Sequence, residues 1–132
     1  MKKLLLFLLV FLGVCTLSKA QNRPADEAAI KQTLSRFGNS WMKADFSDMK
    51  EYMTPDCNWI NIVGMHWHNL KEVQYAHQTF IKTALKGVEA KEISITIRFI
   101  TADVAIAYWL THVGAFYPPD GVNRGMNKQG DK

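Results

Sequence analysis

The stretch "ISITIRFITADVAIAYWLTHVGAFY", residues 93–117, decides the fold. From Ile93 to Phe99, apolar residues alternate with serine, threonine or arginine, a period of two that is typical of a strand with one buried face. The residues "TAD" at 101–103 predict a turn. From Val104 to Tyr117 the chain is apolar on both faces, as in a central strand that is covered on both sides. The stretch therefore predicts two long antiparallel strands.

Three helices are predicted ahead of these strands. The first begins near Pro24, and Gly38 within it indicates a close approach to a neighbouring segment. A short second helix, capped by Ser47, fits the residues "SDMKEYM". Asn69 caps the third helix. The apolar stripe of the first helix consists of Ile30, Leu34, Phe37 and Trp41.

A hairpin is predicted between the second and third helices. Trp59 to Val63 reads as one strand, Gly64 as the turn, and Met65 to His68 as the partner strand. This order of helices, hairpin and long strands predicts an α+β fold, with the helices packed on one face of a curved sheet.

The last fifteen residues, 118–132, are polar and rich in glycine, and no further strand is predicted among them. A central strand needs a neighbour on each edge, because an uncovered apolar edge promotes aggregation. We therefore expect either a partner molecule along that edge or one or two more strands beyond Lys132. The domain at 21–132 is accordingly expected to be incomplete at its C-terminus.

Residues 1–20 have the order of a secretory signal peptide. Two lysines precede an apolar run from Leu4 to Val14, and Ala20 supplies the small residue of a cleavage site. The run is too short for a membrane span, which needs about 20 apolar residues. We expect an exported protein, periplasmic or extracellular, without stable membrane association after cleavage. A lipoprotein signal, with Cys15 as the first mature residue, is the alternative.

Removing this segment changes the charge balance. Three of the sixteen basic residues go with it, which leaves thirteen basic against twelve acidic residues and a net charge of +1. This balance gives no reason to expect a nucleic-acid partner. The remaining 112 residues suit a single domain. Cys57, their only cysteine, predicts a small buried side chain without a disulfide.

A set of residues between Asp26 and Tyr117 forms a recognisable pattern. Its members are Trp41, Asp45, "MTPDCNW" at 53–59, Asn61, Gly64, His77, Phe80 and "RFITADVAIAYW" at 98–109. In this order they resemble the SnoaL-like branch of the nuclear transport factor 2 superfamily, and within it the SgcJ/EcaC-type group. The resemblance implies a cone fold, in which three N-terminal helices pack in a curved antiparallel or mixed sheet around a mostly apolar pocket.

The same resemblance implies a small-molecule ligand and a homodimer. Relatives include isomerases, dehydratases, cyclases and hydrolases, and also members that only bind their ligands. Because one fold carries several activities, the fold alone does not determine the reaction.

His77 and Asn61 are the candidate catalytic residues. His77 lies on the apolar stripe of the third helix, and a histidine that titrates near neutral pH can act as an acid or a base in a pocket. The alternative is a core histidine that is satisfied by one hydrogen bond. Asn61 shares a strand face with Trp59 and can donate to a substrate carbonyl or a developing oxyanion.

The candidate substrate-binding residues are aromatic or polar. Trp41, Trp59 and Trp67 predict flat apolar walls for a planar ligand, although each is equally typical of an ordinary core. Tyr108 and His112 share one face of the second long strand. Both are expected to bind the substrate, and one of them, Tyr108 or His112, to act as an accessory proton donor.

His66 and His68 raise the question of a metal site. On a strand, residues two apart project from one face, so both imidazoles could bind one ion. A zinc site needs three or four protein ligands, and the other candidates show no ligand spacing. The pair fits the exposed arm of a hairpin equally well, so neither a metal nor another cofactor is expected.

Two functional hypotheses follow. The first is an exported small-molecule-binding domain that acts as an isomerase, a dehydratase or a hydrolase-like enzyme through His77. The second is a non-catalytic ligand-binding or dimerisation module. The second is supported by the hairpin, which lacks the carboxylate base of cone-fold isomerases, and by the apolar long strand, which suits an interface between two sheets.

Overall fold

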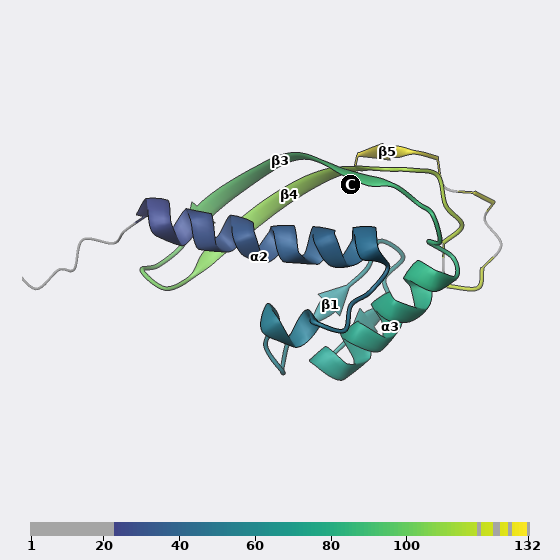
Figure 1. The fold of residues 1–132 in the computed structure, drawn as a ribbon, viewed down its shortest axis with the longest axis horizontal. Helices are drawn as coiled ribbons and strands as arrows, with labels where there is room; N and C mark the ends of the chain where they lie inside the picture. The colour runs from purple at the N-terminus through teal and green to yellow at the C-terminus, as the bar shows by residue number, and fades with distance from the viewer. Residues whose placement is uncertain (1–22, 119, 123–124, 127, 132) are drawn as a thin grey trace, which may run out of the picture.

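The computed structural model describes residues 23–118, 120–122, 125–126 and 128–131. Within these ranges there are two α-helices, one 3-10 helix and five strands, and the strands form two separate antiparallel sheets (Figure 1). The predicted α+β class is confirmed. The elements in chain order are α2 (Arg23–Lys43), η2 (Met49–Glu51), β1 (Trp59–Ile60), β2 (His66–Trp67), α3 (Leu70–Lys82), β3 (Ala90–Phe99), β4 (Ala105–Val113) and β5 (Gly130–Asp131).

Strands β3 and β4 form a long antiparallel hairpin that arches over α2 (Figure 1). Its turn lies at the predicted residues 101–103, where Thr101 Oγ1 donates to Asp103 Oδ1 at 2.7 Å. β5 adds a third strand, which pairs with His112 and Val113 at the end of β4. The two predicted long strands are confirmed, whereas the prediction that no strand follows them is wrong at β5. No apolar alternation marks this two-residue strand in the sequence.

The face of the hairpin that meets α2 is built from half-buried apolar side chains. Ile95 and Ile97 of β3 lie on it, together with Trp109 of β4. Gly38 faces this side of the hairpin, and a Cβ built there would lie 3.6 Å from Trp109 Cη2, which is ordinary van der Waals contact. The helix packs on the hairpin at Gly38 as expected, but this distance does not require a glycine.

The opposite face of the same hairpin carries exposed apolar side chains. Ile106, Tyr108 and Leu110 are 44%, 57% and 39% exposed. Both α-helices lie on the other side of the sheet (Figure 1). Between Ala105 and Leu110, no strand in the described part of the chain pairs with the second edge of β4. The hairpin thus has one packed face and one apolar face that is open to solvent.

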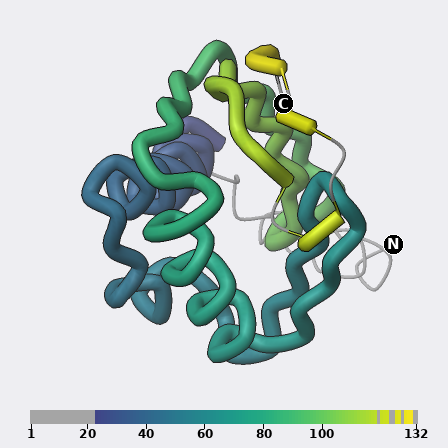
Figure 2. The backbone as a smooth tube through the Cα atoms, turned by 90° about the vertical axis from the view of Figure 1, so that its right-hand side faces the viewer, coloured from purple at the N-terminus to yellow at the C-terminus, as the bar shows by residue number. Residues whose placement is uncertain are grey.

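The closed core lies where the end of α2, η2 and α3 meet. Phe46, Met49 and Val73 have no exposed surface, and Ile81 completes the cluster. In the view of Figure 2, α3 and the segment that carries β1 and β2 lie on two sides of the molecule, with the β3–β4 hairpin above them.

Two glutamines of α3 fix the loop that follows α2. Gln78 Nε2 donates to the carbonyl of Ala44 at 3.0 Å, and Gln78 Oε1 accepts from the backbone N–H of Phe46 at 2.9 Å. Gln74 Nε2 donates to the carbonyl of Phe46 at 2.8 Å. These side chains satisfy backbone groups in a loop, where no helix or strand ladder pairs them. They hold Phe46 in the core.

The ends of the two shorter helices differ in how they match the sequence. Asn69 caps α3 as predicted, because its Oδ1 accepts from the backbone N–H of Glu72 at 3.0 Å. The predicted second helix is only the 3-10 turn η2, which follows Asp48 rather than Ser47. Ser47 is kept outside it by Asp45, whose side chain accepts from both the N–H and the hydroxyl of Ser47.

The predicted signal peptide at residues 1–20, including Cys15, lies outside the described residues. Across the part that is described, no helix is both long and apolar enough to cross a membrane. Cys57 forms no disulfide, packs against the core and is half-buried. Burial raises the pKa of its thiol above the ordinary value, so Cys57 behaves as a small apolar side chain.

Candidate functional site

His77 occupies the centre of the candidate site. It lies on the inner side of α3, and its ring meets the ring of Trp59 edge to face, with centroids 4.6 Å apart. Nδ1 lies 2.8 Å from the carbonyl oxygen of Val73. A carbonyl only accepts, so Nδ1 carries the proton of the neutral ring and Nε2 presents a lone pair. Burial lowers the pKa of His77 below its ordinary value, which favours this neutral form.

The second ring nitrogen of His77 is available to a ligand. Within the described residues, Nε2 has no hydrogen-bond partner, and it is not fully enclosed by protein atoms. The His77 side chain is partly buried and lines a cavity. Nε2 is therefore an acceptor without a partner among the described residues, on a side chain that lines this cavity.

The cavity has a volume of about 260 Å³. This is slightly below the usual range for ligand sites, about 300–1,000 Å³, and suits a small molecule. Asn61 and His77 are its two lining residues with an amide or a titratable side chain, and the rest of the described wall is aromatic or aliphatic. The apolar part of the wall consists of Phe37, Trp41, Trp59, Ile60, Ile62, Trp67, Phe80, Leu85, Val113 and Phe116.

Asn61 presents a donor to the same cavity. Its Oδ1 accepts from the backbone N–H groups of Val63 at 3.1 Å and of Met65 at 2.9 Å, on either side of the predicted turn at Gly64. These two donors fix the orientation of the amide, because its oxygen must face them. Among the described residues, Nδ2 has no hydrogen-bond partner, so it can donate to a ligand. Asn61 thus shapes the hairpin through Oδ1 and is also one of the residues that line the cavity.

The three tryptophans predicted as walls all line this cavity. Trp59 stacks on Phe37 with ring centroids 5.2 Å apart, and the Trp67 ring lies 6.1 Å from that of His77. Trp41 is held from α2 by a hydrogen bond from Nε1 to the carbonyl of Val88 at 3.0 Å. Flat rings from three elements therefore surround the imidazole of His77.

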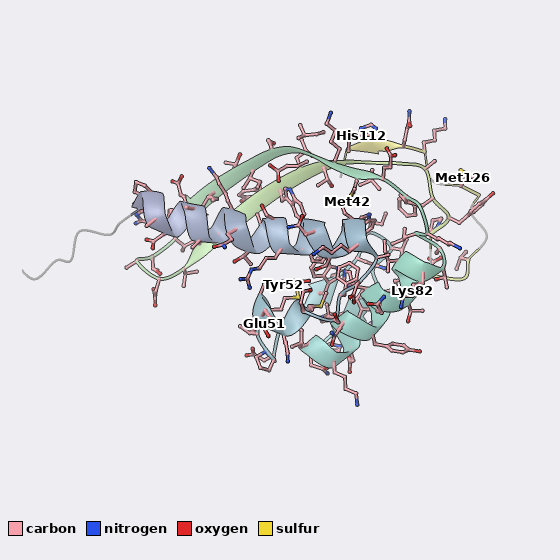
Figure 3. The ribbon with its side chains drawn as sticks, viewed as in Figure 1. Met42, Glu51, Tyr52, Lys82, His112 and Met126 are labelled. Carbon is pink, nitrogen blue, oxygen red and sulfur yellow. The ribbon has the colours of Figure 1, made fainter. Side chains whose placement is uncertain are left out.

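Tyr108 and His112 are not brought into this cavity. Both are exposed and lie on the open face of β4, where Tyr108 is opposite Thr96 and His112 is opposite Lys91. Figure 3 shows His112 on the far side of the sheet from α2 and α3. A period of two places the two residues on one face but does not reveal which face the helices cover. The packed face belongs to Trp109 and its neighbours.

His66 and His68 lie side by side on the hairpin, with ring centroids 3.9 Å apart. Nε2 of His66 hydrogen-bonds Oδ1 of Asn58 at 3.0 Å, and both histidines are exposed. In the described ranges, no group of three or more histidine, cysteine or acidic side chains comes together in a way that could hold a metal ion. The pair lies outside the cavity of His77.

Glu92 is a site residue that the sequence pattern does not reveal. The alternation from Ile93 to Phe99 places Glu92 on the polar face of the strand. A β-bulge between Glu92 and Ser94 instead turns it to the inner face, where its Oε2 accepts from Nε1 of Trp109 at 3.1 Å. A bulge depends on cross-strand register, and no signal in a single strand would have predicted it.

Comparison with models of known protein families gives no match, and comparison with curated protein sequences gives none either. Two solved structures are similar. One is an uncharacterised protein with a cystatin-like fold from Caulobacter vibrioides, with a TM-score of 0.73 and 27% identity, over 80% of this chain and 72% of that one. The other is a domain of unknown function with a cystatin-like fold from Nostoc punctiforme, with a TM-score of 0.63 and 20% identity, over 80% of this chain and 60% of that one. The chain therefore has a cystatin-like fold, the class that includes the cone fold predicted from its sequence.

Proposed function

We propose that this chain is a small-molecule-binding domain of the SnoaL-like kind, and that the cavity around His77 is its site. The observation that carries the proposal is the pairing of one imidazole acceptor and one amide donor in an otherwise apolar, aromatic cavity. Such a site selects a small, partly planar molecule with one hydrogen-bond donor and one carbonyl-like acceptor. The sequence resemblance to the SnoaL-like branch supports the same class of ligand.

The enzymatic form of the proposal uses His77 as the general base and acid. Neutral Nε2 removes a proton from the carbon next to a carbonyl group. The electron pair of that C–H bond forms a C=C bond with the carbonyl carbon, and the π pair of the carbonyl group moves to its oxygen. Nδ2 of Asn61 donates to the oxygen as negative charge develops. Because burial lowers the pKa of His77, its imidazolium is a stronger acid than an ordinary one and returns its proton more readily. Return to another carbon gives isomerisation, and transfer to a leaving hydroxyl gives dehydration.

Two substitutions test these roles. His77→Gln removes the titrating group, and we expect it to abolish turnover of an enolisable ketone panel while the protein stays folded by circular dichroism. The matched control is His68→Gln, because His68 is exposed and outside the cavity. Unchanged turnover in His77→Gln removes His77 from the mechanism.

Asn61→Asp separates the two ends of the amide. An aspartate keeps an oxygen for the N–H groups of Val63 and Met65 but has no N–H to donate. We expect the hairpin to persist while turnover falls by about 100-fold or more, the usual loss for one oxyanion donor. Turnover at the wild-type level would exclude Asn61 as a donor.

A second candidate function, a dimerisation or binding module without catalysis, is favoured by the open face of β4. Exposed Ile106, Tyr108 and Leu110 would be buried if two copies met through this face. Sedimentation equilibrium tests it: we expect a homodimer that Leu110→Lys converts to a monomer. If the wild type is monomeric at all concentrations and inactive in every panel, ligand binding is the one proposed function that remains.

Export is proposed from the first twenty residues. We expect the mature protein to begin near Gln21, and mass spectrometry of the N-terminal peptide from the secreted or periplasmic fraction tests this. A peptide that begins at an acylated Cys15 would support the lipoprotein alternative.

A further inference from the structure

A second cavity, of about 300 Å³, lies between α2 and the inner face of the β3–β4 hairpin. It shares four lining residues with the cavity of His77, so the two are neighbouring compartments with common walls: Phe37, Trp41, Trp59 and Val113. Its remaining aromatic wall is Trp109, whose ring meets Phe37 edge to face with centroids 5.9 Å apart. Four aromatic side chains therefore surround this space.

Glu92 is the charged residue among those that line the second cavity, and no described lining residue carries a positive charge. Its Oε2 accepts from Nε1 of Trp109, whereas Oε1 has no partner within the described residues. The carboxylate is exposed, so it remains hydrated when the cavity is empty and needs no buried counter-ion. An oxygen with free lone pairs thus lies at the rim of an aromatic space.

All five of these side chains favour a positively charged ligand. The faces of tryptophan and phenylalanine rings attract cations through their quadrupoles, and a carboxylate adds a full negative charge. An anionic ligand would be repelled by Glu92, and a neutral donor would gain a hydrogen bond from it but no charge attraction.

We infer that the second cavity is a binding site for an organic cation, such as an aryl or alkyl ammonium group, with Glu92 as its counter-ion and Phe37, Trp41, Trp59 and Trp109 as its aromatic walls. The ammonium group contacts Oε1 of Glu92 while the apolar body of the ligand lies between the rings. The β-bulge is what makes the site, because without it Glu92 would point to the open face. The site does not depend on a catalytic role for His77.

The test uses three probes of similar size: 2-phenylethylamine, which is cationic at pH 7.5, 2-phenylethanol and 3-phenylpropanoate. All four tryptophans of the chain line one or both cavities, so intrinsic fluorescence reports occupancy directly. Isothermal titration calorimetry on the full chain gives the dissociation constants. We expect the amine to bind about tenfold more tightly than the alcohol, within the range of cation–π contacts, and the carboxylate to bind more weakly than either. Equal binding of amine and alcohol overturns the proposal.

Variants identify the residue that is responsible. Glu92→Gln removes the charge but keeps an oxygen that accepts from Trp109 Nε1. We expect this variant to bind the amine only as tightly as it binds the alcohol. Glu89→Gln changes an exposed carboxylate that lines neither cavity, and should keep the preference. A preference that survives Glu92→Gln, or that Glu89→Gln reduces equally, overturns the assignment. His77→Gln is expected to keep the preference, which separates this site from the proposed function.

Discussion

Two regions of the molecule bury their side chains to very different extents. One is the core around α3, and the other is the β3–β4 hairpin. In the core, Phe46 and Met49 are fully enclosed, and Gln78 satisfies the backbone groups of the loop beside them. In the hairpin, Ile106 and Tyr108 leave much of their apolar surface in solvent. Stability is therefore concentrated in the core, whereas the hairpin supplies the walls of the cavities on one face and an apolar contact surface on the other.

The largest expected difference comes from deleting one large ring in each region. Phe46→Ala should lower the free energy of unfolding by about 3–5 kcal/mol, because it leaves a cavity in a closed core. Tyr108→Ala on the open face should change it by no more than about 0.5 kcal/mol. Urea unfolding followed by circular dichroism measures both. Equal losses would show that the hairpin face is buried in solution, for example in a homodimer.

A smaller loss is expected when the loop after α2 loses its side-chain partner. Gln78→Leu leaves the N–H of Phe46 and the carbonyl of Ala44 without their bonds, which should lower the free energy of unfolding by about 1–3 kcal/mol. Gln32→Leu, at an exposed position of α2, is the control and should have little effect. If both variants unfold at the same urea concentration, the glutamine bonds do not stabilise the core.

The cap of α3 contributes less again. Asn69→Ala removes the acceptor for the N–H of Glu72 and should lower the free energy of unfolding by about 1 kcal/mol. Asn39→Ala within α2 should not destabilise, since alanine is the better helix former. A thermal melt of each variant compares them, and an unchanged melting temperature in Asn69→Ala would contradict the role of the cap.

The smallest expected effect is the pH dependence of the free energy of unfolding that comes from His77. Burial lowers the folded-state pKa of His77 below its ordinary value of 6.5, so the unfolded chain binds the proton first as pH falls. Stability from this group is present above pH 6.5 and is lost as pH falls from there through the lowered pKa. His77→Gln should flatten the stability profile between pH 8 and pH 5. A slope that persists in His77→Gln would assign it to other groups.

Much of the candidate site follows from local patterns. The stripe of α3 places His77 inward, as side-chain geometry imposes on a regular helix. The alternation from Trp59 to Asn61 places these two residues on the more buried side, although Asn61 lies just beyond the end of β1. The cap at Asn69 and the turn at Gly64 follow from equally local chemistry.

Other parts of the site could not be predicted in this way. Tyr108 and His112 share a face by periodicity, yet the face that α2 covers depends on packing between distant segments. Glu92 reaches the inner face through a bulge that exists only in the pairing of β3 with β4. The second helix is only the 3-10 turn η2, and its predicted cap, Ser47, is instead hydrogen-bonded to the side chain of Asp45.

The amino-acid sequence by itself determined the two α-helices, the long hairpin and the inward position of His77, because each depends on residues within a few positions of one another. Only the tertiary structure decided that Asn61 and His77 line one cavity, that Tyr108 and His112 lie on the open face, and that Glu92 joins four aromatic rings. These three features depend on contacts between residues that are far apart in the chain, where register and packing, rather than local propensity, determine which way a side chain points.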